Sequence, residues 1–345
     1  MSIDLQSSAP APVTITLLQL LEQDCLLSSQ CVPGHTLPLC FWEKALLDPA
    51  RTFFSAPGKS FRASLVDLGW RLAGGASPVP PELPIILEAL HGGSLIVDDI
   101  EDYSTQRRGR PALYLTHGLP LALNTGNWLY FWALNLVHRL ELPSGIEQQL
   151  SRRFSSTLLH CHSGQALDLS VRLTALRQEE LPSIVAVVSG LKTGQLMGLA
   201  TSLGAIAAGG SVALVDALTA YGQQLGKALQ MLDDLSNLSD QVDIAKRYED
   251  LRNNRPSWVW AWLAEDLSAA HFVRLQQRNS EVVSGAQPGP LAAAMLSHLG
   301  AGGVTRIDQC FDEGWRQLCD VVAPNKCIEA LWQELVRLKA GYGRL

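Results

Sequence analysis

Apolar positions recur along most of the chain with the three- and four-residue spacing of amphipathic helices, and few segments alternate as strands do. Ile86, Leu90, Gly93, Val97 and Ile100, for example, mark one face of a helix. The breaks between helices fall at proline- or glycine-rich segments: 78–81, 109–111, 143–145, 209–210, 288–290 and 302–303. The pattern predicts an all-α fold, a bundle of long helices around a central cavity.

No shift in composition and no fixed-period repeat marks a domain boundary, so we expect a single helical domain over residues 14–345. Residues 1–13 are polar and rich in alanine and proline, and we expect them to be disordered. They have neither the basic start nor the long apolar run of a signal peptide. The apolar stretch at 205–215 is too short and too broken by glycine to cross a bilayer, so we expect no membrane span.

The composition adds limits on partners and compartment. Of the 345 residues, 47% are hydrophobic and only 17% are charged, which fits a large core together with a buried partner interface. The formal net charge of -6 argues against non-specific binding to nucleic acid, so an anionic substrate would need clustered arginine and lysine. Seven cysteines without C-x-x-C spacing indicate reduced thiols and a cytoplasmic protein.

Four acidic residues lie within a span of five, at Asp98, Asp99, Glu101 and Asp102. Asp98 and Asp102 are four residues apart, so their carboxylates share one helical face, and His91 lies nearly in line with Asp98 two turns earlier. Like charges at this spacing repel, which makes the cluster unfavourable in a helix unless a cation is present. Mg²⁺ takes one or two carboxylates together with water and substrate phosphates, and it suits this pair.

A solvated acidic helix end explains most isolated motifs of this kind. Two features favour a metal site here. The cluster follows an apolar run, and Arg107 and Arg108 follow it before a glycine–proline stop. Carboxylates for a metal ion beside guanidinium groups for phosphates are suited to a magnesium–diphosphate complex.

A second helix carries Gly222, Gly226, Gln230, Asp233 and Asp234. The two glycines, four residues apart, permit close contact with another helix or with a bulky substrate. Gln230, Asp234 and, less closely, Asp233 fall toward one side of this helix. Together with the first cluster, the pattern implies carboxylates that converge from two facing helices.

Three further cationic segments are candidates for anion binding, although a surface position explains each one taken alone. They contain Lys59 and Arg62, then Lys192 with Thr193, and finally Lys246 and Arg255. Residues 58–60 resemble the end of a phosphate loop but lack its earlier glycine, which leaves nucleotide binding unsupported. The His–Cys–His sequence at 160–162 does not form a zinc site, because consecutive helical residues point in different directions.

Taken in order, these motifs resemble those of the trans-prenyl diphosphate synthases over residues 58–260. The similar segments are Gly58-Lys59-x-x-Arg62, His91 with the first aspartate-rich motif, Arg107-Arg108-Gly109, Gly164-Gln165, Lys192-Thr193, Gln230-x-x-Asp233-Asp234 and residues 246–258. Residues 95–111 are most similar to animal and fungal geranylgeranyl diphosphate synthases, and residues 246–258 to farnesyl diphosphate synthases. The resemblance implies a homodimeric, Mg²⁺-dependent prenyltransferase that joins isopentenyl diphosphate to an allylic diphosphate.

The resemblance also implies a role for each matching residue. Asp98, Asp102 and Asp233 would bind about three Mg²⁺ ions. Isopentenyl diphosphate would be held by Lys59, Arg62, His91 and Arg108, and the allylic diphosphate by Arg107, Lys192, Lys246 and Arg255. Thr193 and Gln230 would lie beside the developing allylic cation and, with Lys192, are the catalytic candidates. Two positions depart from the family pattern, since Asn237 replaces the final aspartate of the second motif and Arg255 replaces a lysine.

Product length is predicted from Gly93 and Ser94. In the family, aromatic residues at these two positions floor the cavity and stop growth at farnesyl diphosphate. Both are small here, so we expect geranylgeranyl diphosphate, with farnesyl diphosphate as the alternative. Helix packing explains two small residues equally well. Trp128, four residues before Trp132, either closes the cavity deeper down or belongs to the core.

Two other functions are compatible with the same scaffold. A class I terpene cyclase needs the metal carboxylates and the allylic diphosphate site, but no second diphosphate site. The presence of Lys59, Arg62, His91 and Arg108 therefore favours chain elongation. A non-catalytic partner subunit is expected to lose metal carboxylates, and Asn237 is the only sign of such a loss.

Overall fold

The computed structural model describes residues 13–30, 32–55, 61–76, 78–239 and 247–340. Regular structure in these residues is helical except for an antiparallel hairpin of β1 (Gln106–Arg107) and β2 (Arg110–Pro111), which confirms the predicted all-α class. The chain divides into two compact units, Met1–Asp67 with Ala76–Ser151 and Leu68–Gly75 with Arg152–Leu345. Two helices, α4 (Phe61–Leu72) and α8 (Ser144–Ser170), contribute residues to both units. The single domain over 14–345 stays a prediction, and residues 1–12 lie outside the described residues.

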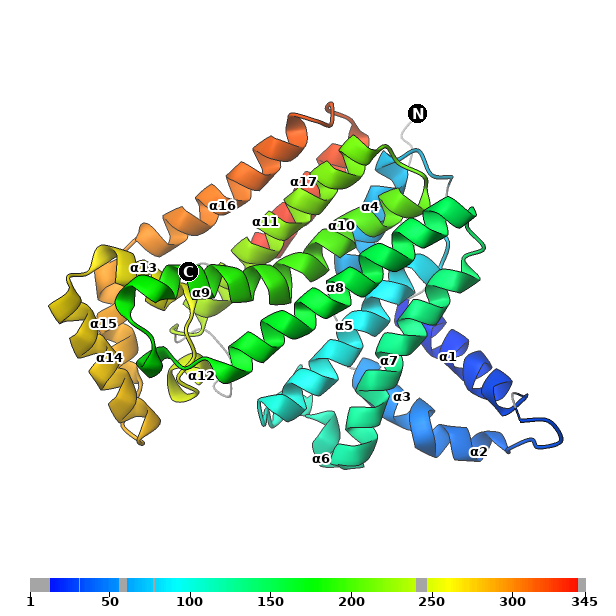
Figure 1. Cartoon of the computed structure of the whole chain (residues 1–345), viewed down its shortest axis with the longest axis horizontal. Helices are drawn as coiled ribbons and strands as arrows, with labels where there is room; N and C mark the ends of the chain where they lie inside the picture. Colours follow the sequence, from blue (N-terminus) through cyan, green and yellow to red (C-terminus); the bar gives the residue numbers. More distant parts are fainter. Residues whose placement is uncertain (1–12, 31, 56–60, 77, 240–246, 341–345) are drawn as a thin grey trace, which may run out of the picture. The chain divides into compact units, whose positions relative to one another are not determined.

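The first unit is organised by two long helices, α5 (Glu82–Glu101) and α7 (Leu119–Arg139), which pack side by side (Figure 1). The other elements of this unit are α1 (Val13–Gln30), α2 (Leu39–Trp42), a π-helix (Glu43–Leu47), α3 (Asp48–Phe54) and α6 (Leu113–His117). Glycine allows the close approach of α5 and α7, because a Cβ on Gly93 would lie 2.7 Å from the carbonyl oxygen of Gly126. The structure therefore supports helix packing as a role for Gly93.

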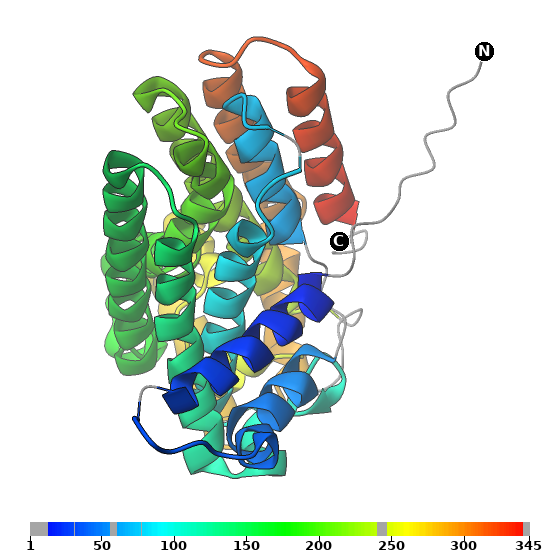
Figure 2. The same ribbon diagram turned by 90° about the vertical axis from the view of Figure 1, so that its right-hand side faces the viewer.

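Helix α1, dark blue in Figure 2, packs against α5 and is tied to α7 by polar contacts. Asp24 on α1 accepts a hydrogen bond from Trp132 Nε1 at 2.6 Å and pairs with Arg139 Nη1 at 2.6 Å. The Trp128 ring stacks on Trp132 with a centroid distance of 5.4 Å. Because Trp132 is anchored to α1, the adjacent Trp128 ring is held against a fixed surface.

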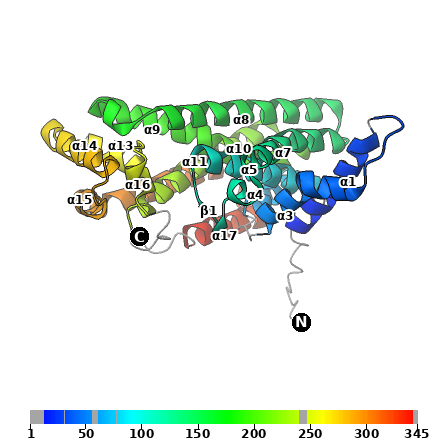
Figure 3. The ribbon, with the colours of Figure 1, turned by 90° about the horizontal axis from the view of Figure 1, so that it is seen from below.

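The second unit is all helical, and α10 (Gln195–Ala207), α11 (Val212–Ser236) and α16 (Gly302–Cys319) form its centre (Figure 1). Its other elements are 3₁₀ turns at Leu173–Ala175 and Gln178–Glu180, a π-helix (Gly190–Gly194), α9 (Leu181–Ser189), α12 (Glu249–Arg252), α13 (Trp258–Asp266), α14 (Ala269–Val283), α15 (Gly289–Leu299) and α17 (Lys326–Ala340). Helix α14 lies beside α15 and α13 (Figure 3). Helix α11 begins at an N-cap, Ser211, whose hydroxyl accepts a hydrogen bond from the Leu214 backbone N–H.

The two glycines of α11 serve close helix contact. A Cβ on Gly226 would lie 2.8 Å from the Thr193 carbonyl oxygen, and one on Gly222 would overlap Thr201 Oγ1 and the Met197 carbonyl. Of the two roles considered for these glycines, the structure supports packing against α10 and the preceding π-helix.

One helical run, Gln178–Ala207, is long and apolar enough by length and composition alone to cross a membrane. Its last part is α10, in which every residue from Leu196 to Ala207 is buried inside the second unit. Burial of this kind is typical of a core helix.

Candidate active site

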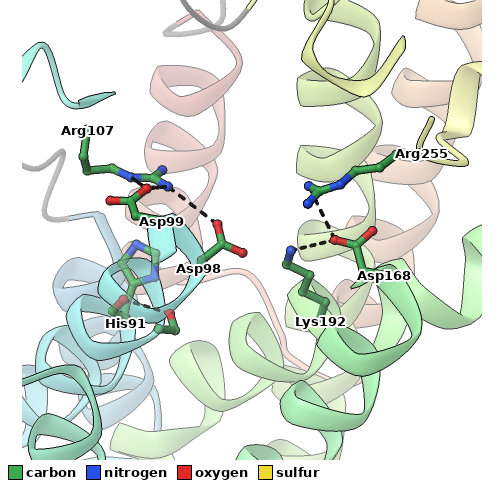
Figure 4. Close-up of polar contacts among 8 residues, drawn as sticks. His91, Asp98, Asp99, Arg107, Asp168, Lys192 and Arg255 are labelled. Atoms are coloured by element: carbon green, nitrogen blue, oxygen red, sulfur yellow. Dashed lines mark hydrogen bonds and ion pairs between the residues drawn. The ribbon is translucent and has the colours of Figure 1, made fainter. Parts of the chain in front are cut away.

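The first acidic cluster lies at the end of α5. Asp98 and Asp102 are half-buried, Glu101 is exposed, and Asp99 is almost fully buried. Asp99 accepts hydrogen bonds from Arg107 on β1, at 2.9 Å from Nε and a shorter distance from Nη2 (Figure 4). The Arg107 Nη2 also lies 3.6 Å from an Asp98 oxygen. Asp99 therefore fixes the guanidinium group of Arg107 beside the carboxylate of Asp98.

Arg108 occupies a strained position in the turn that joins β1 and β2. Its φ is 52° and that of Gly109 is 73°, so two consecutive residues are left-handed, as in a type I′ hairpin turn. An arginine in this region is unfavourable by about 1 kcal/mol or more. The guanidinium group lies over the Phe53 ring, 5.8 Å from its centroid. Backbone strain of this kind is often found at functional sites.

His91 lies two turns before Asp98 on α5, and its Nδ1 atom is enclosed, with no hydrogen-bond partner among the described residues. Burial, reinforced by the charges of Arg62, Arg108 and Arg107, holds the pKa of His91 well below its ordinary value of 6.5. Burial raises the pKa of Glu88, one turn earlier, and the charges of Arg62 and Arg108 oppose that rise. The first unit thus gathers arginines around a neutral imidazole.

The second unit contains a separate cluster of charged groups around Asp168 on α8. An Asp168 oxygen lies 2.9 Å from Lys192 Nζ and 3.7 Å from Arg255 Nη1 (Figure 4). Lys192 belongs to the π-helix Gly190–Gly194, an irregular geometry that is frequent at functional sites. Asp168 is buried, so it holds two cations together in an environment that strengthens their attraction.

A hydrogen-bond chain orients the catalytic candidates of this unit. Thr193 Oγ1 donates to Gln230 Oε1 at 2.9 Å, and Gln230 Nε2 donates to Asp234 Oδ1 at 2.8 Å. The other oxygen of Asp234 accepts the Trp258 backbone N–H at 2.7 Å. Burial raises the pKa of Asp234 to about 7. These contacts fix the orientation of the Gln230 amide.

Asp233 and Asn237 lie at the end of α11. Asp233 is exposed, whereas its neighbour Asp234 is buried. Asn237 Oδ1 accepts the Asp250 backbone N–H at 3.4 Å, and its carbonyl accepts the Tyr248 N–H at 2.9 Å. The asparagine thus anchors the chain at the start of α12.

The two units each contain part of the predicted site. The first unit holds Arg62, His91, Asp98, Asp102, Arg107 and Arg108, and the second holds Lys192, Thr193, Gln230, Asp233 and Arg255. Lys59 and Lys246 lie outside the described residues. Within the second unit, the structure brings together Lys192 and Arg255, and separately Thr193 and Gln230.

Sequence reasoning missed two residues that the structure connects to these clusters. Asp168 pairs with both cations of the second unit, and Glu88 lies among the arginines of the first. Asp168 had a local sign, since it follows Gln165 by nearly one helical turn. Asp99 was recognised as part of the acidic cluster, but its role in holding Arg107 follows only from the fold.

The family model for polyprenyl synthetases matches residues 43–282. Among curated relatives, a geranylgeranyl pyrophosphate synthase of Eremothecium gossypii is 32% identical over 215 residues, covering 61% of this chain and 67% of the relative. A short chain isoprenyl diphosphate synthase of Methanothermobacter thermautotrophicus is 34% identical over 206 residues, covering 59% and 62%. A geranylgeranyl pyrophosphate synthase of Hypoxylon pulicicidum is 35% identical, and the match spans only 48% of its length.

Solved structures share the fold over nearly the whole chain. The geranylgeranyl pyrophosphate synthase of Corynebacterium glutamicum, complexed with isoprenyl diphosphate and magnesium, has a TM-score of 0.74 at 21% identity, covering 95% of this chain and 98% of that one. A polyprenyl synthase of Caulobacter crescentus, complexed with calcium and isoprenyl diphosphate, has a TM-score of 0.73 at 20% identity, covering 96% and 94%.

The chain therefore belongs to the polyprenyl synthetase family. This membership confirms the resemblance predicted from the motifs, and with it the class of enzyme, a transferase of prenyl groups.

Proposed function

We propose that this protein condenses isopentenyl diphosphate with an allylic diphosphate to give a longer trans-prenyl diphosphate. The observation that carries the proposal is the presence of two separate cationic clusters. One gathers Arg62 and Arg108 near His91, and the other joins Lys192 and Arg255 through Asp168. Two clusters suit two diphosphate substrates, whereas a cyclase of the same fold needs only one.

Divalent metal use is part of the proposal, with Asp98, Asp102 and Asp233 as the ligands. The donors fit Mg²⁺, because all three are carboxylates and the α5 pair is half-buried one helical turn apart. The Corynebacterium and Caulobacter structures were obtained with magnesium and calcium, respectively. When bound, Mg²⁺ acts as a Lewis acid that neutralises charge on a leaving diphosphate. The proposal includes about three ions, the number that the family resemblance implies.

The allylic diphosphate binds to Lys192 and Arg255, the cations of the second unit, together with Lys246. Asp168 holds Lys192 and Arg255 at a defined spacing, so their charges face the leaving group without reorganisation. The carbocation left behind then lies beside the oxygens of Thr193 and Gln230, whose dipoles stabilise positive charge. The Gln230 amide is already oriented by Thr193 and Asp234.

Isopentenyl diphosphate binds to Arg62, His91 and Arg108, together with Lys59. The pKa of His91 is held well below 6.5, so a neutral ring joins the two arginines in this site. The alkene attacks the allylic cation and a proton is then lost. The diphosphate released from the allylic substrate accepts that proton, so no side chain need serve as general base.

The main product we propose is geranylgeranyl diphosphate, with farnesyl diphosphate as the alternative. Ser94 is half-buried and small, one turn before Asp98, and leaves space for a growing chain. Relatives from Eremothecium gossypii and Hypoxylon pulicicidum carry the name geranylgeranyl pyrophosphate synthase. Trp128, stacked on the anchored Trp132, remains the candidate for a deeper floor.

We also propose a cytoplasmic homodimer. Helix α7 exposes a line of apolar side chains, Leu119, Leu123 and Phe131, at intervals of four or eight residues on one face. Phe131 is 72% exposed, which is unusual for a large aromatic side chain on a long helix. A second copy of the chain would bury this line.

Release of inorganic diphosphate tests the function against its rivals. The purified protein is incubated with Mg²⁺ and an allylic diphosphate, with and without isopentenyl diphosphate. The proposed synthase releases diphosphate rapidly only when both substrates are present. Equal release from the allylic substrate alone, with a hydrocarbon product, would identify a terpene cyclase, and no release in either case would identify a non-catalytic subunit.

A further inference from the structure

Hydrogen bonds in the second unit join the loop that carries Arg255 to the segment that follows Asp168. The Asn254 carbonyl accepts the Leu173 backbone N–H at 2.8 Å. The Asn254 side chain makes two contacts with Thr174, donating from Nδ2 to Oγ1 at 2.8 Å and accepting the backbone N–H at 3.3 Å. One asparagine thus contacts two consecutive residues just beyond the end of α8.

The backbone at Asn254 is left-handed, with φ at 56°. Asparagine adopts this region more readily than most residues with a side chain. The next residue, Arg255, donates its backbone N–H to the Asp250 carbonyl at 2.9 Å. The sharp reversal at Asn254 and this hydrogen bond together set the point from which the Arg255 side chain extends.

Helix α14, beside α15 in Figure 3, supports the junction with two amides on one face. Asn279 is completely buried, and its Nδ2 donates to Asn254 Oδ1 at 3.2 Å. Gln276, three residues earlier, donates to the carbonyls of Leu173 and Leu176 at 2.8 and 3.0 Å. Gln276 is half-buried. Burying an amide donor is costly unless its hydrogen bond is made, so the bonds that these two side chains donate make the junction a defined structure rather than a chance contact.

Each side of this junction lies close in sequence to one partner of an ion pair. Asp168 lies five residues before Leu173, and Arg255 directly follows Asn254. The Arg255 guanidinium lies 3.7 Å from Asp168, which also holds Lys192. Fixing Asn254 to residues 173–174 therefore fixes the spacing of Arg255 relative to Asp168 and Lys192.

We propose that Asn254 is a positioning residue for the allylic diphosphate: through Thr174 and Asn279 it sets Arg255 beside Asp168 and Lys192. The inference rests on the proposed function, because it assigns Arg255 and Lys192 to the allylic substrate. Asn254 itself contacts neither substrate. Loss of the Asn254 side chain weakens binding of the allylic diphosphate. Binding of isopentenyl diphosphate, which is assigned to arginines of the first unit, stays unchanged.

The test compares Asn254→Gly, Asn254→Ala and Asn254→Asp. Glycine keeps the left-handed backbone and loses only the side-chain contacts, whereas alanine loses both. We expect KM for the allylic diphosphate to rise about tenfold in the glycine variant and further in the alanine variant, since small displacements of binding groups have large effects. Aspartate tolerates the same backbone and keeps the acceptor for Asn279 and Thr174, so it restores most of the affinity. KM for isopentenyl diphosphate stays within about twofold in all three.

A second variant and a matched control come from the same segments. Thr174 is exposed, and valine has nearly the same shape as threonine. Thr174→Val removes the hydroxyl that accepts from Asn254 Nδ2, so we expect it to raise KM for the allylic diphosphate by a smaller factor. Asn253→Ala removes the same side chain one residue earlier, at an exposed position, and leaves both KM values unchanged. Direct titration with a thiolodiphosphate analogue of the allylic substrate, in Mg²⁺, measures the loss of affinity independently of turnover.

The outcomes separate this inference from the function on which it rests. A wild-type protein that neither turns over nor binds the analogue contradicts the proposed function. Normal turnover in the wild type with an unchanged allylic KM in Asn254→Gly overturns the positioning role alone. Equal loss of affinity for both substrates also overturns it, because it indicates general destabilisation.

Discussion

In each aspartate pair of this protein, the second residue orients a nearby side chain, and only the first is a candidate metal ligand. In the pair Asp98–Asp99, the half-buried first carboxylate is the metal candidate and the buried second one holds Arg107. The pair Asp233–Asp234 repeats the arrangement, with the second carboxylate holding Gln230 and the Trp258 N–H. Consecutive helical residues point in different directions, which is why a doubled aspartate supplies both a ligand candidate and a support.

The metal assignment predicts the effect of removing one carboxylate. We expect Asp98→Ala to lower turnover in Mg²⁺ by several orders of magnitude while the protein remains folded, because a metal ligand is lost. Glu101→Ala removes a nearby exposed carboxylate that is not a ligand candidate and serves as the matched control. Steady-state kinetics and circular dichroism on both variants check the prediction, and near wild-type turnover in Asp98→Ala would refute the assignment.

The buried imidazole of His91 predicts a pH dependence of stability. Burial and the charges of Arg62, Arg108 and Arg107 hold its pKa well below 6.5. The unfolded chain therefore binds a proton at a higher pH than the folded one. Stability from this group is fully present above pH 6.5 and is lost as the pH falls from there toward the folded pKa.

Thermal melting of the wild type and of His91→Gln checks this sign. We expect the wild type to lose more stability than the variant between about pH 7.5 and pH 5, because only the wild type carries the buried imidazole. His298→Gln removes an exposed histidine and should follow the wild type. Identical pH curves for the wild type and His91→Gln would contradict the prediction.

At the scale of helices, the apolar spacing and the Gly–Pro breaks were sufficient to predict the fold class and the ends of several helices. Residues 86–100 do lie in a single helix, α5, and three residues of the predicted apolar face, Ile86, Leu90 and Gly93, are buried. The pattern could not predict the π-helix around Lys192, because its wider turn follows from packing against α11 rather than from residue type. The division into two compact units also has no marker in the composition.

The candidate site was predictable only as far as its chemistry is local. Asp98 and Asp102 share a turn and could be paired from spacing alone. Asp168 and Lys192 are far apart in sequence and meet through the fold, so periodicity could not join them. The packing role of Gly93 needed the distance to Gly126, and its part in product length stays a prediction.

The packing of α5 on α7 bears on product length. Ser94 follows Gly93, which lies against α7, and the Ser94 hydroxyl donates to the His91 carbonyl at 2.8 Å. We expect Ser94→Phe to shift the main product from geranylgeranyl to farnesyl diphosphate, because the ring fills space that the chain would occupy. Chromatography of the dephosphorylated products checks it, and an unchanged product would remove Ser94 from the length determinants.

Two variants separate packing from product length in the same region. Gly93→Ala should lower stability by about 1–3 kcal/mol without shortening the product, because its Cβ meets the Gly126 carbonyl. Trp128→Ala lengthens the product only if that ring closes the cavity, and otherwise lowers stability alone.

For the whole molecule, the exposed face of α7 predicts assembly. We expect the wild type to be a dimer at micromolar concentration and Phe131→Glu to be a monomer, because a charge replaces an aromatic ring that is 72% exposed in one chain. Val283→Glu places a charge at another exposed apolar position, on α14, and should leave the dimer intact. Light scattering decides, and a wild-type monomer would contradict the prediction.

Condensation of the two diphosphates is tested most directly by following the carbon of isopentenyl diphosphate. Labelled isopentenyl diphosphate is incubated with the purified protein, Mg²⁺ and an allylic diphosphate, and the label is traced into acid-labile products. We predict that the label enters a longer allylic diphosphate, mainly geranylgeranyl, and that omitting either the allylic substrate or Mg²⁺ abolishes the transfer. Label that stays in isopentenyl diphosphate, under conditions where the protein is folded and both substrates are in excess, would contradict the proposed function.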